Sequence, residues 1–249
     1  MSLPVTWLFL RGLSREHAHW GDFPERCKQE LGWNCIHLDL AGFGSENHRS
    51  SPLSIPSIRA DLQTRLNTAP HEKIGIIALS LGGMVALDWL ATEPERFSHS
   101  ILINSSTADC PPLHRLRLSN LSPMLRSLGS RSVKVQERNI LNMVSNQSDT
   151  SEALEHWCQI RQQRPVLKSN VLRQLAAAAH FRSPAKRLIA NPPLFIASKA
   201  DRMVSWRCSE RLAKKYRSAL LLHESAGHDL PLDDSGWLIE QLKENLGSL

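Results

Sequence analysis

The sequence predicts an α/β fold, in which a mostly parallel sheet carries helices on both faces and a helical lid is inserted late in the chain. Short apolar runs alternate with helix-like segments, a pattern typical of parallel strands connected by covering helices. About ninety residues separate the apolar run that ends near residue 104 from the next clear strand, near residue 193. Such a connection is too long for an ordinary loop, so we expect it to form helices of its own.

The individual elements follow from apolar periodicity and from the turn residues between the apolar runs. We expect strands near residues 5–10, 34–39, 73–79, 99–104, 193–198 and 218–223. Helix-like patterns lie near residues 17–31, 54–68, 81–92, 206–216 and 235–246. Amphipathic stretches in the long connection predict further helices over residues 113–128, 133–144, 151–164 and 169–180. The core is therefore expected to comprise residues 1–106 and 188–249, with the lid over residues 107–187.

Length and composition suit a single α/β core. With 249 residues, of which 41% are hydrophobic, the chain can bury one substantial core with a modest insertion. No apolar run approaches the roughly 20 residues that a transmembrane helix needs, so we expect no membrane span. The segment Leu3–Leu10 has no basic n-region and leads directly into Arg11, which predicts a core strand and not a signal peptide.

The five cysteines are odd in number, scattered along the chain and without a C-x-x-C pair. This pattern argues against a disulfide or zinc framework and favours a reducing, cytoplasmic location. None of the five stands on a sharp strand-to-helix turn, which argues against a cysteine nucleophile.

The most informative segment is the junction between the apolar run Ile74–Leu79 and the helix-like run that starts at Leu81. Ser80 stands at this junction, with the small residues Ala78 and Gly82 on either side. Small flanking residues allow a tight turn that pushes a serine hydroxyl out over the end of a sheet, the arrangement called a nucleophile elbow. A serine that only caps the following helix would give a similar local pattern. We expect Ser80 to be a covalent nucleophile.

Two later segments carry the groups that such a serine requires. A serine hydroxyl is a weak nucleophile at neutral pH and needs a base within hydrogen-bond reach. The run Pro193–Val204 indicates a buried strand that ends in a turn bearing Asp201. The run Ala219–Pro231 indicates the last strand, with His228 in the loop beyond it.

These segments, together with two near the N-terminus, resemble the α/β-hydrolase superfamily over nearly the whole chain. Leu8–Leu13, followed by Trp20, is similar to its first core strand and oxyanion turn, and Leu38–Ser45 is similar to its Asp-x-x-Gly-x-Gly-x-Ser loop. The elbow, the Asp201 turn and the His228 loop follow in the order nucleophile, acid, histidine that is usual there. The resemblance is to the lidded branch of small carboxylesterases and acyl-carrier-protein ester hydrolases, and it implies a lid inserted after the sixth conserved strand.

The resemblance implies a serine hydrolase that cleaves a carboxylic ester or thioester through an acyl-enzyme intermediate and needs no cofactor or metal. Ser80 would attack the carbonyl carbon, His228 would act as the base, and Asp201 would orient the imidazole. The oxyanion hole would consist of the backbone N–H groups of Leu13 and Leu81. The residues expected at the substrate are Arg11, Gly12, His114, Arg115 and Arg117.

Three residues near the expected site leave alternatives open. Arg11 stands where the superfamily usually has a histidine that supports the oxyanion loop, so we expect an effect on loop shape and substrate preference more than on activity. Asp109 follows the strand after which some relatives carry the acid, and it is the alternative to Asp201. Asp229, beside His228, is expected to point away from the imidazole and to have a structural role.

Charge is concentrated in the expected lid. Residues 107–187 contain thirteen Lys or Arg and five Asp or Glu, a net charge of +8 against +6 for the whole chain, which leaves the core near −2. A positive rim over the pocket would attract acidic substrates, including an ester or thioester on an acidic carrier protein. The alternative is that the lid helices simply have solvated basic faces. The basic residues are not interleaved with stacking aromatics, so we expect no nucleic-acid partner.

Other functions are compatible with parts of this pattern. A protein of this fold could bind a ligand without catalysis, although it would not then require Ser80, Asp201 and His228 together. Hydrolysis of a carbon–carbon bond, or a lyase step, could use the same triad, and fold alone does not decide among these reactions. His17 and His19 form an H-x-H pair that could suggest a metal, but no third ligand stands at a recognisable spacing.

Overall fold

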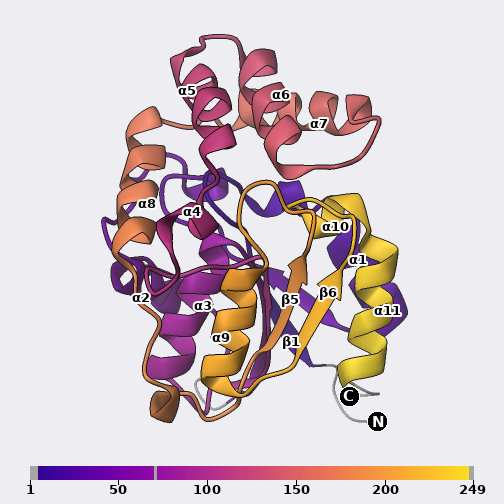
Figure 1. The fold of residues 1–249 in the computed structure, drawn as a ribbon. Coiled ribbons are helices and arrows are strands. Elements are labelled where there is room, and N and C mark those ends of the chain that lie inside the picture. The colour runs from indigo at the N-terminus through magenta and orange to yellow at the C-terminus, as the bar shows by residue number, and fades with distance from the viewer. Residues whose placement is uncertain (1–4, 70–71, 247–249) are drawn as a thin grey trace.

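The structure is a computed structural model that describes residues 5–69 and 72–246, and these residues form one sheet of six parallel strands (Figure 1). The strand order is β2–β1–β3–β4–β5–β6. The strands are β1 (Thr6–Leu10), β2 (Asn34–His37), β3 (Ile74–Leu79), β4 (Phe97–Ile103), β5 (Leu194–Ser198) and β6 (Leu220–His223). The predicted α/β fold is confirmed. Residues 3 and 4 of the segment expected to form the first strand lie outside the described residues.

Alternating side chains place helices on both faces of the sheet. Leu8 and Leu10 of β1 pack with one layer of helices, and Trp7 and Phe9 pack with the other. The first layer consists of α2 (Ile55–Arg65), α3 (Leu81–Thr92) and α9 (Arg207–Tyr216). The second layer consists of α1 (Phe23–Leu31) and α11 (Ser235–Leu246). Because both faces are covered, β1 and β3 are buried along their whole length.

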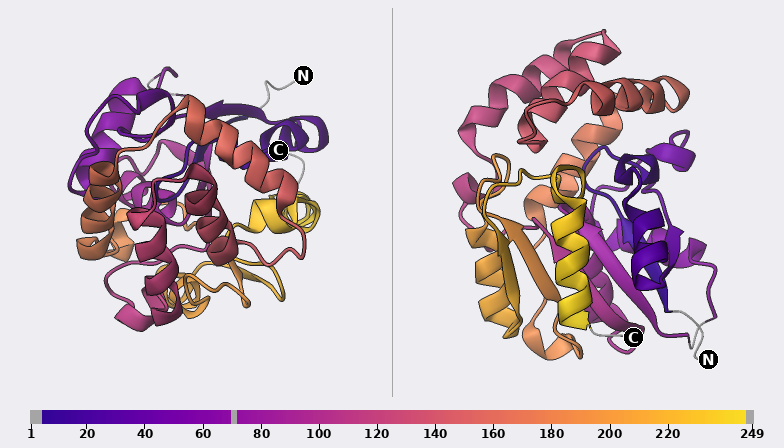
Figure 2. Two further views of the ribbon diagram at one scale, coloured as in Figure 1. Left: turned by 90° about the horizontal axis from the view of Figure 1, so that it is seen from above. Right: turned by 90° about the vertical axis from the view of Figure 1, so that its right-hand side faces the viewer.

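Between β4 and β5 the chain leaves the sheet for about ninety residues and forms a set of helices, termed here the inserted helices. They are α4 (Pro112–Arg115), α5 (Leu121–Gly129), α6 (Val133–Val144), α7 (Ser151–Gln163) and α8 (Lys168–His180). Helices α5, α6 and α7 lie beyond the carboxyl ends of the strands (Figures 1 and 2), and their own apolar cluster includes Leu141 and Trp157. Helix α8 runs back beside the core, where Ala177 and Phe181 join the cluster of α2 and α3.

Two predicted helices are interrupted, and each interruption has a local cause. The expected helix over residues 17–31 is a 3₁₀ helix (His17–Trp20) followed by α1, because Gly21 between them adopts a φ of 60°. The expected helix over residues 113–128 is divided into α4, a 3₁₀ turn and α5. Pro123 lacks a backbone N–H and would clash inside a continuous helix, so α5 begins only two residues before it.

The remaining predicted boundaries agree with the structure to within about three residues. A short helix, α10 (Leu230–Asp233), follows the loop after β6, and further 3₁₀ turns lie at Gly44–Glu46, Leu118–Asn120 and Lys186–Leu188. Within residues 5–69 and 72–246, no helix combines the length and the hydropathy needed to cross a bilayer.

Candidate active site

Ser80 lies between β3 and α3, on a turn with a strained backbone. Its φ of 57° and ψ of −115° fall outside the regions that most side chains adopt. The N–H of Ser80 donates to the Ile103 carbonyl (2.9 Å), and its carbonyl accepts from the Ser105 hydroxyl (2.8 Å), so the end of β4 holds the turn. A Cβ at Gly82 would lie 2.6 Å from the Leu10 carbonyl oxygen. Glycine at this position therefore lets α3 begin close against β1.

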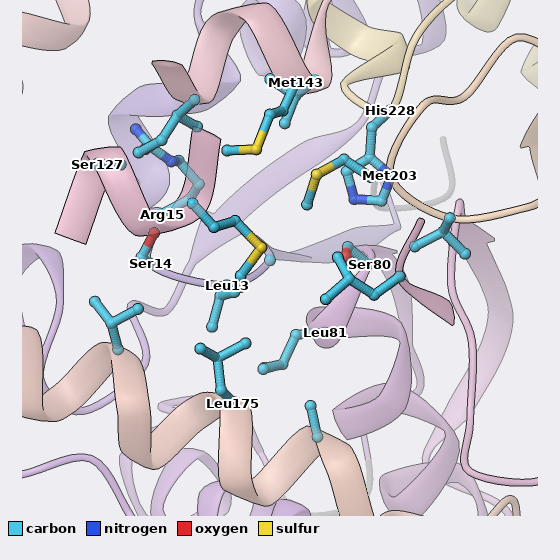
Figure 3. A pocket seen from close by; sticks show the side chains of 18 of the residues that line it. Leu13, Ser14, Arg15, Ser80, Leu81, Ser127, Met143, Leu175, Met203 and His228 are labelled. Atoms are coloured by element: carbon cyan, nitrogen blue, oxygen red, sulfur yellow. The ribbon is translucent and has the colours of Figure 1, made fainter. Parts of the chain in front are cut away.

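His228 and Asp201 meet at the same end of the sheet. Asp201 Oδ2 accepts from His228 Nδ1 at 2.7 Å, while Oδ1 accepts from the N–H groups of Met203 (2.7 Å) and Val204 (3.0 Å). With the proton on Nδ1, Nε2 is left to accept a proton. Burial disfavours the charged ring, but the charge and hydrogen bond of Asp201 outweigh it and raise the pKa of His228 above the ordinary 6.5. His228 and Ser80 line one cavity (Figure 3).

Asn104, a residue that sequence reasoning missed, holds the loop of His228. Its Nδ2 donates to the His228 carbonyl (2.8 Å), and its Oδ1 accepts from the N–H of Ser198 at the end of β5 (2.8 Å). Asn104 is buried, directly follows β4 and has a φ of 48°. Asparagine tolerates positive φ better than most residues. An asparagine just after an apolar strand was therefore the available sequence signal.

The turn after β1 brings the expected oxyanion residues to the elbow. A Cβ at Gly12 would lie 3.0 Å from the Cβ of Ser80, so the turn passes directly over the serine. As the first residue of α3, Leu81 has a backbone N–H with no partner inside its own helix. Leu13 and Leu81 both line the cavity that contains Ser80 (Figure 3).

Arg11 forms a buried ion pair with Asp229. Its two terminal nitrogens donate to the two carboxylate oxygens at 3.1 and 2.5 Å, and its guanidinium lies 4.8 Å from the centroid of the Trp20 ring. Arg11 is 3% exposed and Asp229 is 2% exposed. The pair joins the turn that carries Leu13 to the loop that carries His228, so it fixes the position of one relative to the other.

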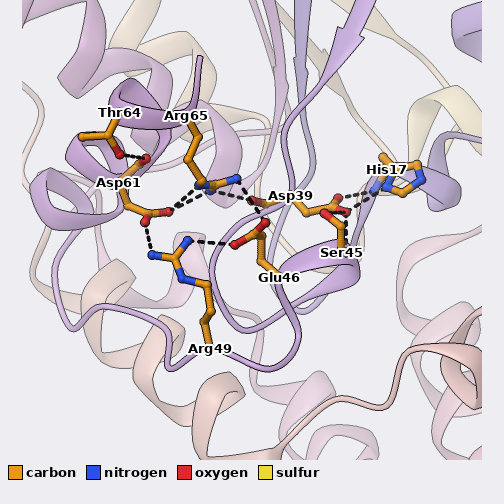
Figure 4. Close-up of polar contacts among 8 residues, drawn as sticks. All are labelled: His17, Asp39, Ser45, Glu46, Arg49, Asp61, Thr64 and Arg65. Atoms are coloured by element: carbon orange, nitrogen blue, oxygen red, sulfur yellow. Dashed lines mark hydrogen bonds and ion pairs between the residues drawn. The ribbon is translucent and has the colours of Figure 1, made fainter. Parts of the chain in front are cut away.

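Asp39 supports the turn after β1 from another side. Its carboxylate accepts from the backbone and ring nitrogens of His17 (2.7 and 2.8 Å) and from the N–H and hydroxyl of Ser45 (2.9 and 3.1 Å), as Figure 4 shows. Gly44 allows this arrangement, because a Cβ there would lie 2.1 Å from Asp39 Oδ2. The same loop is tied to α2 by ion pairs among Glu46, Arg49, Asp61 and Arg65 (Figure 4).

The segment after α6 is bonded to the loops of both the acid and the histidine. Asn146 Nδ2 donates to the carbonyl of Ala200 (3.1 Å), which precedes Asp201, and to that of Ser225 (3.0 Å), in the loop of His228. Asn146 therefore joins the inserted helices to the loop of Asp201 and to the loop of His228.

A cavity of about 350 Å³ lies over the elbow. Its wall is formed by the elbow, the turn after β1 and the inserted helices. The wall is mostly apolar and includes Leu13, Met84, Met124, Ile140, Met143 and Met203. Figure 3 shows Ser80 and His228 together on one side of this space. A cavity of this size and character suits a small apolar group with a few polar contacts.

The five residues expected at the substrate fall into two groups. Arg11, Gly12 and Arg115 line the cavity. The terminal nitrogens of Arg115 donate to two alanine carbonyls near the end of α8 (2.6 and 3.0 Å), so this guanidinium secures the junction of α4 and α8. His114 and Arg117 are not among the described residues of the cavity wall, and the Arg117 side chain is exposed.

The alternative acid and the H-x-H pair have other partners. Asp109 accepts from the N–H of Ser183 (2.7 Å), whereas the His228 ring bonds Asp201. His17 bonds Asp39, as described above. Within the described parts of the chain, no group of three or more His, Cys, Asp or Glu side chains is placed to hold a metal ion.

Known proteins share this architecture. The family described as "Alpha/beta hydrolase family" matches residues 7–241. A protein of Pseudomonas savastanoi pv. phaseolicola named "Putative carbamate hydrolase RutD" is 25% identical over 235 residues, which cover 90% of this chain and 86% of that protein. The structure of the enol-lactonase from Burkholderia xenovorans LB400 matches with a TM-score of 0.78 at 14% identity, over 98% of this chain and 92% of that chain.

A second solved structure, the 2-hydroxy-6-oxo-6-phenylhexa-2,4-dienoate hydrolase BphD from Rhodococcus sp. strain RHA1, matches with a TM-score of 0.74 at 19% identity, over 98% of this chain and 90% of that chain. At such identities the structural matches establish the fold alone. The family match spans nearly the whole chain and includes the elbow, the acid turn and the histidine loop. The protein therefore belongs to the α/β hydrolase family.

Proposed function

We propose that the protein is a serine hydrolase that cleaves a carboxylic ester or thioester through an acyl-enzyme intermediate. The observation that carries this proposal is the hydrogen bond between His228 and Asp201 at the wall of the cavity that Ser80 also lines. A histidine held in one tautomer near a strained, cavity-lining serine is the arrangement that acyl transfer requires. Membership of the α/β hydrolase family supports the same reaction class.

Each catalytic group has a defined part in the proposed reaction. His228 Nε2 takes the hydroxyl proton as Ser80 Oγ attacks the carbonyl carbon, and then gives that proton to the leaving alcohol or thiol. The Asp201 carboxylate keeps the proton on Nδ1 and stabilises the imidazolium. Water then hydrolyses the acyl-enzyme with His228 as the base.

The N–H groups of Leu13 and Leu81 stabilise the oxyanion in this proposal. Each such donor is typically worth ~3 kcal/mol of transition-state stabilisation. The Arg11–Asp229 pair acts as a positioning element, because it holds the turn of Leu13 against the loop of His228.

We further propose that residues 107–187 form a lid and that residues 1–106 and 188–249 form the catalytic core. The cavity wall draws on both parts, so closing the lid would exclude water and strengthen the electrostatic interactions inside. The substrate in this proposal is a small-molecule acyl ester or thioester in the cytoplasm. An acidic carrier protein, which the lid charge suggested, gains no support from the comparisons.

A carbamate is a second candidate substrate. The Pseudomonas relative named for carbamate hydrolysis aligns with 90% of this chain. A carbamate carbonyl would meet the same nucleophile and the same oxyanion donors. A carbamate and a carboxylic ester of one alcohol, assayed side by side, distinguish the two substrates.

A fluorophosphonate probe tests the nucleophile. It should label the wild-type protein once and should not label Ser80→Ala, because only an activated serine reacts. Ser127→Ala is the matched control, since it removes another hydroxyl from the same cavity wall and should label like the wild type. Full labelling of Ser80→Ala would contradict the proposal. p-Nitrophenyl and coenzyme A esters of graded chain length identify the bond that is cleaved and the length of acyl chain that the site accepts. This activity should be lost in Ser80→Ala.

A further inference from the structure

The cavity has a second polar end, formed by two arginines that the proposed reaction does not use. Arg15 and Arg161 line the same cavity as Ser80. Figure 3 shows Arg15 and Ser80 on opposite sides of this space, with Leu13 between them. Arg15 is only 6% exposed and lines the cavity, so its charge is shielded from bulk solvent.

Three neighbours hold Arg15. Its Nη1 donates to the Glu137 carboxylate (2.7 Å) and to His19 Nε2 (2.8 Å), and its guanidinium lies 4.7 Å from the centroid of the Trp157 ring. Arginine can only donate, so His19 Nε2 accepts and the ring is neutral. Burial and the Arg15 charge lower the pKa of His19 well below 6.5, which agrees with that state. The guanidinium is therefore fixed before any ligand arrives.

The second terminal nitrogen of Arg15 has no acceptor among the residues that the structure describes. A buried donor left unpaired costs about 1–3 kcal/mol, and more when it is charged. Buried polar groups in proteins are paired in the large majority of cases. Arg15 lines the cavity, and an unpaired nitrogen on its buried, fixed guanidinium is a group that can bind an anion there.

The charges at this end do not balance. Arg15 and Arg161 share the fully buried carboxylate of Glu137, from which Arg161 Nη1 lies 3.6 Å away. The carboxylate of Asp229, which also lines the cavity, is occupied by both terminal nitrogens of Arg11. Two guanidinium groups beside one carboxylate leave a surplus positive charge. In an apolar cavity that charge is weakly screened, so it attracts an anion more strongly than a surface arginine does.

We propose that the Arg15 end of the cavity binds a free carboxylate on the substrate, so that the preferred substrates are half-esters or half-thioesters of dicarboxylic acids. The inference rests on the proposed function. Ser80 attacks the ester carbonyl, the bond to the alcohol or thiol breaks, His228 passes the proton to that leaving group, and water releases the dicarboxylic acid. The Cα atoms of Leu13 and Arg15 lie at most about 7 Å apart and both residues line the cavity, so a dicarboxylic acid of intermediate length, such as adipic acid, is the first to test.

The wild-type protein tests the proposal with one matched pair of substrates, monoethyl adipate and diethyl adipate. The two have the same acyl chain and alcohol and differ in the free carboxylate. We expect kcat/KM to be at least tenfold higher for the half-ester, mainly through a lower KM. Equal values, or a preference for the diester, would overturn the proposal.

Variants locate the effect. Arg15→Met should reduce the half-ester preference to about that of a neutral site, whereas Arg131→Met, an exposed arginine before α6, should keep the wild-type ratio. If Arg15→Met does not fold, Glu137→Gln provides a second test of the proposal. It keeps both arginines and removes their shared negative charge, so KM for the half-ester should fall. An unchanged or raised KM in a folded Glu137→Gln protein would contradict the surplus charge.

Binding without turnover separates this inference from the proposed function. Calorimetry on Ser80→Ala should show monoethyl adipate binding at least tenfold more tightly than diethyl adipate, which lacks the free carboxylate. If the half-ester binds in this way but no ester is hydrolysed by the wild type, the anion site stands and the ester hydrolase proposal is wrong. If both esters are hydrolysed equally and the half-ester binds no better than the diester, the hydrolase proposal stands and the anion site is wrong.

Discussion

Arg11 and Arg15 stand four residues apart on one turn, yet they serve the two ends of the cavity in opposite ways. Both are buried, and their guanidinium groups lie over the rings of Trp20 and Trp157 respectively. Arg11 has a carboxylate of its own and uses both terminal nitrogens on it. Arg15 shares its carboxylate with Arg161 and keeps one nitrogen unpaired within the described chain.

The contrast lies in charge balance, because Arg11 has the carboxylate of Asp229 to itself, whereas Arg15 and Arg161 share that of Glu137. Both terminal nitrogens of Arg11 bind Asp229, and only its buried Nε lacks an acceptor among the described residues, so Arg11 is suited to fixing the geometry of two loops. At the far end, the incomplete pairing of Arg15 leaves both charge and donor available for recognition. Under the two proposals, chemistry and recognition occupy opposite ends of one cavity.

The largest expected effect is on kcat, when the proposed base or its acid is replaced. His228→Ala or Asp201→Asn should lower kcat by about 10⁴, because the serine then lacks a base or the base lacks its correct tautomer. Steady-state kinetics on a neutral ester measure this loss. Monoethyl adipate should still bind both variants by calorimetry, since Arg15 is untouched. If binding disappeared together with catalysis, the two ends would not be separable.

The next effect concerns stability and compares the two arginines directly. Arg11→Met leaves Asp229 buried without its partner and should lower the free energy of unfolding by about 3–5 kcal/mol. Arg15→Met should cost less, because Glu137 keeps Arg161 as a neighbour. Urea unfolding followed by tryptophan fluorescence measures both. Arg11→Met combined with Asp229→Leu should recover most of the loss, and a double variant as unstable as the single one would show that the ion pair is not the cause.

The smallest effect is in the pH profile of the wild-type enzyme. Only neutral His228 accepts the serine proton, and Asp201 raises its pKa against the effect of burial, so kcat/KM should rise through an apparent pKa above 6.5. Arg11 lowers that pKa, so Arg11→Met should move the rise to higher pH. The pH dependence of kcat/KM measures both. A rise at or below pH 6.5 in the wild type, or a shift to lower pH in the variant, would contradict this electrostatic balance.

Features whose signals are local could be predicted from the sequence. The strand, the turn and the helix around Ser80 are visible in one short segment, because small residues and an apolar run specify them without reference to the rest of the chain. Asp201 and His228 each follow an apolar run in the same way. The two helices that differ from prediction are interrupted at Gly21 and just before Pro123, which lies in the first turn of α5, because backbone constraints override apolar periodicity there.

Features that depend on distant partners could not be predicted. Arg11 and Asp229 are 218 positions apart, and nothing in either neighbourhood identifies the other as its partner. The positive charge of residues 107–187 was visible only as a total. Which charges reach the cavity depends on how each helix is turned, and Arg115 lines the wall while Arg117 is exposed. Arg15, which lies outside that segment, was missed because Glu137, the carboxylate that it shares with Arg161, is 122 positions away.

The hydrogen bonds of Asn146 limit how the inserted helices can move. Its side-chain amide, just after α6, donates hydrogen bonds to the carbonyl of Ala200, which precedes Asp201, and to that of Ser225 in the loop of His228. Lifting α6 at this edge would break both hydrogen bonds at once, together with those that Val144 accepts from the Asp229 N–H and Ser145 accepts from Arg202. If the proposed lid opens while Ser80, Asp201 and His228 stay in place, other segments must move and the end of α6 beside Asn146 must stay fixed.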